Sequence, residues 1–126
     1  MSAKPKEKVA ILGASDNPER YAYKAYKMLQ EYGHSTFPVH PSLEKVENTQ
    51  VTHQILELKK ENIDTLTLYV NPRILESYVE QIIELKPRRV IFNPGTESFA
   101  IEQKFENAGI KTIEGCTLVM LRTNQF

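Results

Sequence analysis

Residues 9–20 read Val9-Ala10-Ile11-Leu12-Gly13-Ala14-Ser15-Asp16-Asn17-Pro18-Glu19-Arg20, an apolar run that meets a glycine and then the opening signals of a helix. Gly13 can take backbone angles that a Cβ atom forbids. Ser15, Asp16 or Asn17 can cap a helix whose first turn Pro18 pre-sets. The free N–H groups at the start of such a helix, together with its dipole, favour a phosphorylated ligand above the turn.

This turn is not the three-glycine dinucleotide fingerprint G-x-G-x-x-G. Ser15 and Pro18 stand at its second and third glycine places, so the match is weak. The alternative is a tight strand-to-helix turn that holds no ligand. We favour a ligand because the first strand–helix turn of an open parallel sheet is its usual binding crevice.

Composition narrows the classes of partner. The chain has 126 residues, enough for one domain, and its 16 Lys and Arg balance 16 Asp and Glu. No global charge therefore draws it to nucleic acid or to an anionic membrane. Cys116 is the single cysteine, which favours a reducing, cytoplasmic setting, and no apolar run has membrane-spanning length. We expect a disordered segment at residues 1–7 and one domain at residues 8–126.

Strand patterns alternate with helical patterns along the chain, which is typical of βαβ units around a parallel sheet. In the first helix, which ends near Gly33, four apolar residues share one face: Ala22, Ala25, Tyr26 and Leu29. Strands are expected at residues 8–12, 35–39, 65–70, 89–92 and 111–114, and further helices at residues 55–60, 72–86 and 97–108. In the helix at residues 97–108, Ile101, Phe105 and Ala108 share a face. The prediction is a single three-layer α/β domain with a five-stranded parallel sheet.

Two segments are less regular. Residues 42–50 are predicted to form a polar loop, with a short extended piece around Val51, and the tail from Cys116 is ambiguous. In that tail Val119 and Leu121 either form a dimer contact or pack back on the sheet.

A parallel sheet of this kind brings four segments to its carboxyl edge: residues 13–20, 40–42, 71–72 and 93–96. They carry one Arg and one His, and Asp16 is their only acid before the next helix. Such a set suits phosphates and an aromatic base better than acid–base chemistry. Taken singly, Asn71-Pro72 and Asn93-Pro94 are more typical of turns than of contacts, but their convergence on one edge favours binding.

The end of the second strand bears on the choice of ligand. NAD-binding domains usually place Asp or Glu there for the ribose hydroxyls, whereas this chain reads Val39-His40-Pro41-Ser42. Glu44 comes too late in the chain to take that place. Lys45 is either a contact for a ribose phosphate or a solvated surface side chain.

Four motifs together resemble those of the small stand-alone CoA-binding domain proteins, which are similar to the first domain of the succinyl-CoA synthetase alpha subunit. The motifs are Gly13-Ala14-Ser15 with Asn17-Pro18 and Arg20, Pro38-Val39-His40-Pro41, Asn93-Pro94-Gly95, and Glu114-Gly115-Cys116. The resemblance spans about residues 8–116. It implies a Rossmann-like domain that binds coenzyme A across the carboxyl edge of the sheet.

The resemblance also implies a set of cofactor-binding residues. The turn begun by Gly13 and Ala14 would cradle phosphate with Ser15, Asp16, Asn17 and Pro18, and Arg20 would neutralise it. Val39, His40 and Pro41 would flank the adenosine end, Tyr69, Val70 and Asn71 would lie along the cofactor, and Asn93, Pro94 and Gly95 would approach the pantetheine arm. In the stand-alone family Asn usually stands where this chain has His40.

No catalytic or metal-binding residue is predicted. The synthetase carries its phosphorylated histidine on a second domain, which these residues lack. His34 and His53 are expected to be structural or exposed, and no acid is spaced beside His40 to form a pair. No Cys, His and Asp cluster has metal-ligand spacing. For Cys116 a half-buried thiol is favoured over a mixed disulfide with CoA.

The sequence thus predicts a module that binds CoA or acyl-CoA and has no catalytic activity of its own. Two alternatives stay open: a subunit or small enzyme that acts on an acyl-CoA with a partner chain, and an NAD(P)-binding redox sensor. A homodimer and a synthetase-type partner chain are the protein partners that this prediction allows.

Overall fold

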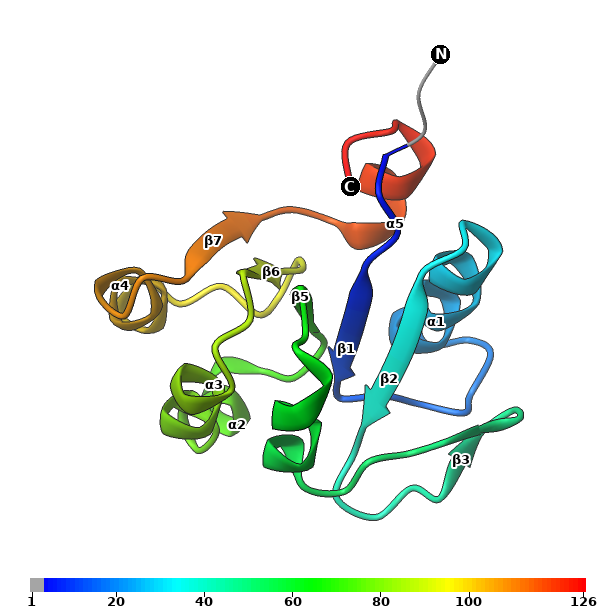
Figure 1. Ribbon diagram of the computed structural model, residues 1–126, viewed down its shortest axis with the longest axis horizontal. Coiled ribbons are helices and arrows are strands. Elements are labelled where there is room, and N and C mark those ends of the chain that lie inside the picture. Colours follow the sequence, from blue (N-terminus) through cyan, green and yellow to red (C-terminus); the bar gives the residue numbers. More distant parts are fainter. Residues whose placement is uncertain (1–3) are drawn as a thin grey trace.

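The computed structural model describes residues 4–126 and has a parallel sheet at its centre (Figure 1). The strands of this sheet are β1 (Lys8–Leu12), β2 (Ser35–Val39), β5 (Thr65–Leu68), β6 (Arg89–Phe92) and β7 (Lys111–Glu114). Their order across the sheet is β2-β1-β5-β6-β7, and every neighbouring pair is parallel. β1, β2, β6 and β7 have the bounds that the sequence predicts, whereas β5 ends at Leu68 and not at residue 70.

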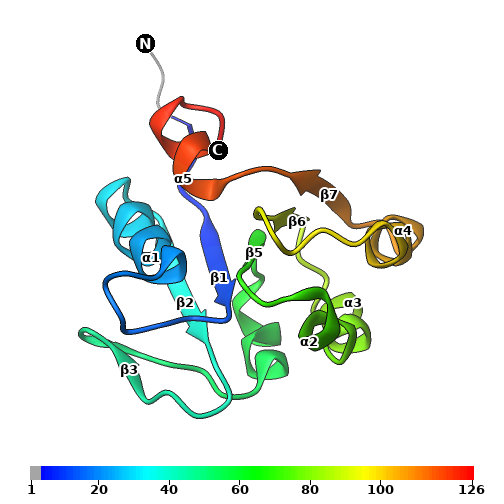
Figure 2. The same ribbon diagram turned by 180° about the vertical axis from the view of Figure 1, so that it is seen from behind.

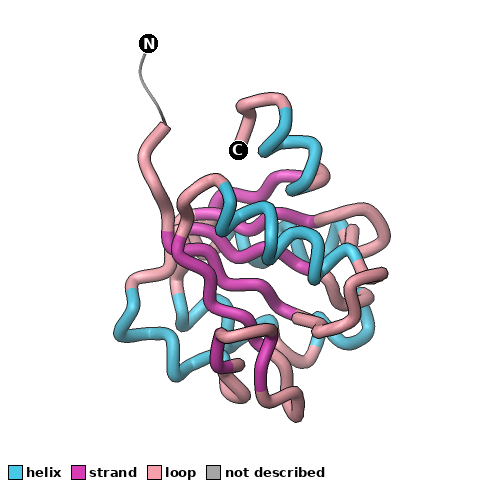
Figure 3. The backbone as a smooth tube through the Cα atoms, turned by 90° about the vertical axis from the view of Figure 1, so that its right-hand side faces the viewer, coloured by secondary structure: helices cyan, strands magenta, loops and turns pink. Residues whose placement is uncertain are grey.

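Helices cover both faces of the sheet (Figure 3). They are α1 (Tyr21–Glu31), the 3₁₀ helix η1 (Ile55–Glu61), α2 (Pro72–Glu76), α3 (Val79–Leu85), α4 (Phe99–Asn107) and α5 (Thr117–Arg122). Because side chains alternate along a strand, β1 serves two cores. Its Val9 and Ile11 pack with α1 and α5, while Ala10 and Leu12 join a larger cluster with η1, α2, α3 and α4. The predicted three-layer α/β fold is confirmed.

The start of α1 differs from the prediction. The helix begins at Tyr21, and its N-cap residue, Arg20, makes no side-chain cap. Ser15 and Asn17 instead accept hydrogen bonds from nearby backbone N–H groups. Asn17 N donates to Ser15 Oγ at 3.0 Å, and Glu19 N donates to Asn17 Oδ1 at 2.9 Å. Short polar side chains compete with a helix in this way, so the chain turns once more before α1 begins. The prediction that Ser15, Asp16 or Asn17 caps this helix is wrong, while its predicted buried face is confirmed.

The predicted loop at residues 42–50 contains a small antiparallel hairpin of β3 (Lys45–Val46) and β4 (Thr49–Gln50). Val46 is fully buried, and the Tyr26 hydroxyl of α1 donates to its carbonyl oxygen at 3.1 Å. The hairpin thus depends on contacts with α1, which no local pattern reveals. After it, Thr52 forms a parallel bridge with Val39, which agrees with the extended piece expected around Val51.

In place of the helix predicted at residues 72–86, the structure has two helices, α2 and α3. Ser77 and Tyr78 separate them and belong to neither helix. The Ser77 hydroxyl donates to the carbonyl oxygen of Ile74 at 2.7 Å, and Tyr78 N donates to the carbonyl oxygen of Leu75 at 2.8 Å. These short-range bonds tighten the backbone and interrupt the regular helical pattern.

The last helices also differ in detail. α4 begins at Phe99, since Ser98 Oγ caps it by accepting from Ile101 N at 3.3 Å, and Ala108 is exposed at its end and not on the buried face. The ambiguous tail forms α5. Its Leu121 packs back into the core with β1, while Val119 is exposed.

The start of the described chain lies near α5 and the C-terminus (Figure 2). Of the segment expected to be disordered, residues 1–3 lie outside the described residues. Further along it, Lys6 Nζ donates to the carbonyl oxygen of Tyr32 at 2.7 Å, and Glu7 N donates to His34 Nδ1 at 3.0 Å. Within residues 4–126, no helix is both long and apolar enough to cross a membrane.

Candidate functional site

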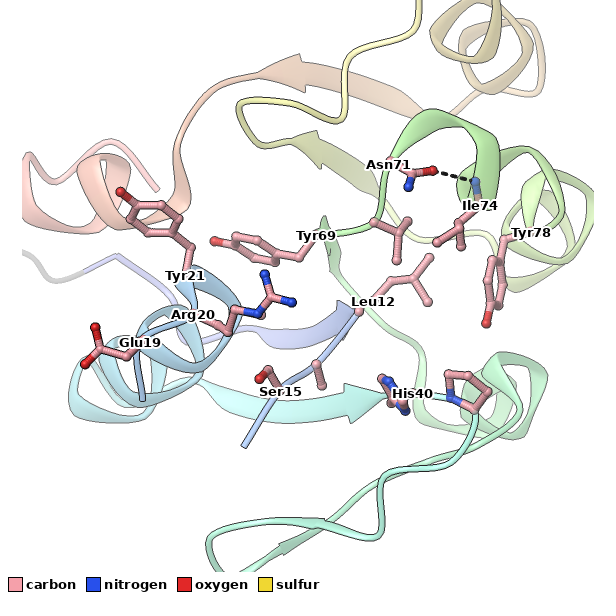
Figure 4. A pocket seen from close by; sticks show the side chains of 15 residues that line it. Leu12, Ser15, Glu19, Arg20, Tyr21, His40, Tyr69, Asn71, Ile74 and Tyr78 are labelled. Carbon is pink, nitrogen blue, oxygen red and sulfur yellow. Dashed lines mark hydrogen bonds between the residues drawn. The ribbon is translucent and has the colours of Figure 1, made fainter. Parts of the chain in front are cut away.

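The carboxyl ends of β1, β2 and β5 open into a cavity of about 640 Å³, which we call the edge cavity (Figure 4). β1 lies between β2 and β5, so the chain runs to opposite sides of it, and ligands of open α/β sheets bind at such a point. The edge cavity is lined by Leu12, Gly13, Ala14, Ser15, Glu19, Arg20, Tyr21, Ala22, His40, Pro41, Tyr69, Val70, Asn71, Ile74 and Tyr78. Its size lies within the range of small-molecule sites.

Gly13 fixes the path of the turn after β1. Its φ is +90°, and a Cβ atom there would lie 2.8 Å from both the carbonyl oxygen of Tyr69 and Val70 Cγ1. Gly13 N and Ala14 N each donate to the carbonyl oxygen of Val39 at 3.1 Å. Val39 is therefore a buried support of the turn and does not line the cavity.

One side of the edge cavity suits an anion. α1 opens onto it at Arg20, Tyr21 and Ala22, and the start of this helix has no side-chain cap. The Arg20 guanidinium points into the cavity (Figure 4) and forms no ion pair within the described residues. Ser15 Oγ accepts from Asn17 N, which leaves the hydroxyl hydrogen free to donate. A cation, a hydroxyl donor and the positive end of a helix together favour phosphate.

His40 stands on the other side, beside Pro41. Its Nδ1 accepts hydrogen bonds from Ser42 N at 3.1 Å and Leu43 N at 3.0 Å, so its ring presents a proton on Nε2. Among the lining residues only Glu19 carries a carboxylate, and that group points outward, away from Arg20 (Figure 4). No carboxylate of the lining therefore pairs with His40.

The walls of the edge cavity are largely aromatic and aliphatic. Burial raises the pKa of the Tyr69 hydroxyl to about 12, so this group keeps its proton at neutral pH. Figure 4 shows the Tyr69 ring near that of Tyr21, with Leu12 and Tyr78 further along. Asn71 Oδ1 caps α2 by accepting from Ile74 N at 2.9 Å, which leaves the Asn71 amide nitrogen free to donate.

A second cavity of about 370 Å³, which we call the side cavity, adjoins the first. It is lined by Tyr21, Tyr69, Asn93, Pro94, Cys116, Leu118, Val119 and Arg122, and so shares Tyr21 and Tyr69 with the edge cavity.

The structure brings together most of the predicted residues from the ends of β1, β2 and β5. Asn93 and Pro94 line the side cavity and not the edge cavity. Outside both linings are Asp16, Asn17 and Pro18 of the turn, Val39, Gly95 and the exposed Lys45. Cys116 is half-buried, as expected.

Sequence reasoning missed several lining residues: Leu12, Glu19, Tyr21, Ala22, Ile74 and Tyr78 in the edge cavity, and Leu118, Val119 and Arg122 in the side cavity. Leu12 and Tyr78 follow the apolar periodicity of core residues, so no local signal marked them. Tyr21 follows Arg20 directly, and a correct start for α1 would have indicated it. Among residues 4–126, no group of three His, Cys, Asp or Glu side chains is placed to hold a metal ion.

Known structures share this architecture. A crystal structure of an uncharacterized protein is 38% identical, with a TM-score of 0.88 over 98% of this chain and 100% of that one. A hypothetical protein from Pyrococcus horikoshii OT3 is 28% identical, with a TM-score of 0.86 over 95% of this chain and 84% of the other.

A more distant likeness shows the fold alone. The dinucleotide-forming acetyl-coenzyme A synthetase 1 of Ca. Korarchaeum cryptofilum is 13% identical, with a TM-score of 0.73 over 84% of this chain and 25% of that one.

No curated protein matches the chain. The profile of the CoA binding domain family, in contrast, matches residues 7–122. This match covers nearly the whole chain, and the protein therefore belongs to the CoA binding domain family.

Proposed function

We propose that the protein binds coenzyme A or an acyl-CoA in the edge cavity. The observation that carries the proposal is the position of Arg20, whose exposed guanidinium points into the cavity beside the uncapped start of α1. The family to which the chain belongs supports the same ligand. The aromatic and aliphatic walls further along suit the less polar parts of such a molecule.

In this proposal the ligand lies along the carboxyl edge of the sheet. Ser15, Arg20 and the first N–H groups of α1 hold phosphate, while Asp16, Asn17 and Pro18 shape the turn. His40 and Pro41 flank the adenosine, with the buried Val39 behind them. Residues 69–71 run beside the pantetheine arm, which extends toward Asn93, Pro94 and Gly95.

Two features favour CoA over NAD(P). β2 is followed by His40 and not by an acid that would accept hydrogen bonds from ribose hydroxyls. Glu19, the one carboxylate of the lining, comes from the turn before α1 and points outward (Figure 4).

The proposal is for binding without catalysis. His40 Nδ1 is already occupied by two backbone N–H groups, so a carboxylate does not orient the ring as it would in a catalytic pair. Apart from the outward-pointing Glu19, the charged and hydroxyl groups beside the start of α1, those of Arg20 and Ser15, are donors suited to holding an anion.

Calorimetric titration of the ligand-free protein tests the proposal, with CoA, acetyl-CoA, NAD, NADP and ATP compared side by side. We expect saturable binding of CoA at one molecule per chain and weaker binding of NAD and NADP. Absence of CoA binding, or tighter binding of NAD(P), would overturn the proposal.

A further inference from the structure

The side cavity continues the edge cavity past the pair of shared residues, Tyr21 and Tyr69. Pro94 and two residues of α5, Leu118 and Val119, supply aliphatic surface to it. Leu118 is buried, while Val119 is 49% exposed and so lies within reach of solvent.

Its one amide side chain, that of Asn93, has little left to offer a ligand. The Asn93 amide nitrogen donates to Thr67 Oγ1 at 2.6 Å and to the carbonyl oxygen of Leu68 at 2.9 Å, and Asn93 Oδ1 accepts from Thr117 N at 2.8 Å. Because these bonds hold β5, β6 and α5 together, Asn93 acts as structure and not as a free contact. The Tyr69 hydroxyl stays uncharged at neutral pH because burial raises its pKa to about 12.

One charged side chain belongs to this lining, that of Arg122, and it is exposed. An exposed guanidinium keeps its hydration, so it does not change the apolar character of the inner walls. A polar end group would leave those walls facing water, whereas a hydrocarbon chain would cover them.

We propose that the side cavity receives the acyl chain of a short aliphatic CoA thioester, so that the protein prefers such thioesters to free CoA. This inference rests on the proposed function, which directs the pantetheine end of the ligand toward Asn93 and Pro94. It identifies the substrate class as acyl-CoA with an uncharged chain.

A series of CoA, acetyl-CoA, butyryl-CoA and hexanoyl-CoA, titrated by calorimetry, tests this inference. Each methylene taken out of water should tighten binding roughly threefold to fourfold until the cavity is filled. Succinyl-CoA belongs in the series because its chain has the length of butyryl-CoA and ends in a carboxylate that Arg122 would attract. It should bind more weakly than butyryl-CoA.

Val119→Asp is the informative variant, since this exposed side chain can change without disturbing the core. It should abolish the preference for hexanoyl-CoA over CoA and leave the affinity for free CoA within about twofold of the parent. Phe99→Asp is the matched control, because Phe99 is exposed on α4 and lines neither cavity. It should retain the full preference.

The outcomes separate the two proposals. If CoA binds but longer chains do not tighten binding, or Val119→Asp keeps the preference, the acyl-chain assignment fails and CoA binding stands. If succinyl-CoA binds as tightly as butyryl-CoA, the aliphatic assignment fails in favour of a carboxylate. If neither CoA nor any thioester binds, the proposed function and the acyl-chain assignment both fail.

Discussion

Arg20 is the residue on which the proposed phosphate site depends most. It lies directly before α1, points into the edge cavity and has no acidic partner within the described residues. A guanidinium that needs no release from an ion pair can offer its full hydrogen-bonding capacity to a phosphate.

Arg20→Ala should weaken CoA binding by about 1–3 kcal/mol, the scale of one charge-assisted contact. Titration calorimetry measures the change. Arg73→Ala is the matched control, because Arg73 is exposed on α2 and lines neither cavity, and it should bind CoA like the parent. Equal affinities for the two variants would place the phosphates elsewhere.

A substitution at Gly13 tests the stability of the fold and not ligand binding. At this residue the turn after β1 comes close to the residues that follow β5. In Gly13→Ala the methyl group would meet the carbonyl oxygen of Tyr69 and Val70 Cγ1, both at 2.8 Å, in addition to the strain of φ +90°. Gly109→Ala is the control, since its φ is +85° but no atom lies within 4 Å of the added Cβ.

Both variants should lose the roughly 1–3 kcal/mol that a strained left-handed residue costs, and Gly13→Ala should lose at least 1–2 kcal/mol more. Urea unfolding provides the two free energies. If they are equal, the contact with β5 is softer than this geometry requires.

At the scale of elements, the packing of α4 beside β7 brings two carboxyl groups together. Glu102 Oε2 of α4 is buried and has no hydrogen-bond partner within the described residues. Burial, followed by the neighbouring Glu114 of β7, raises the pKa of Glu102 from its ordinary value of 4.5 to about 7. The folded protein therefore holds a proton that the unfolded chain has already released between these two pH values.

This difference makes stability fall as pH rises from about 4.5 to about 7, because the folded state binds more protons in that window. Glu102→Gln removes the titration, so the variant should exceed the parent in stability at pH 8 and lie close to it at pH 4.5. Urea midpoints at the two pH values measure the effect. Glu80→Gln, at an exposed position of α3, should keep the pH dependence of the parent. An unchanged slope in Glu102→Gln would contradict the argument.

At the scale of the whole molecule, the two ends of the described chain meet at the amino edge of the sheet, opposite the edge cavity. The centroid of the Phe126 ring lies 5.0 Å from the centroid of the His34 ring and 4.6 Å from Cζ of the Arg89 guanidinium. Arg89 in turn pairs with Glu7 at 3.3 Å. This arrangement ties the C-terminal residues to β6 and to the segment before β1.

Phe126→Ala should reduce the free energy of unfolding by about 1–2 kcal/mol, since it removes one aromatic pair and one cation–π contact. It should leave CoA affinity unchanged because the ring lies at the other end of the strands. Chemical denaturation and calorimetry of the same protein check both parts. Gln125→Ala, at an exposed neighbour, should change neither, and a weaker CoA affinity in Phe126→Ala would show that the two edges are coupled.

The parallel sheet follows from the amino-acid sequence alone, because apolar strand runs of regular length alternate with helices whose buried positions repeat at helical spacing. The same pattern placed Ser15, Arg20, His40 and Asn71 at one edge, since all parallel strands end on the same side. These features follow from local patterns and from the geometry of βαβ units.

The other features of the fold and the site depend on contacts that no local sequence pattern reveals, most of them between distant segments. The start of α1 at Tyr21 depends on a competition for backbone N–H groups within the turn, and the hairpin around Val46 depends on Tyr26 of α1. Asn93 has a structural role because its amide links the end of β6 to two other elements, β5 and α5. The side cavity exists because α5 packs against α1 and Leu121 is buried against β1, contacts that no pattern in the tail itself reveals.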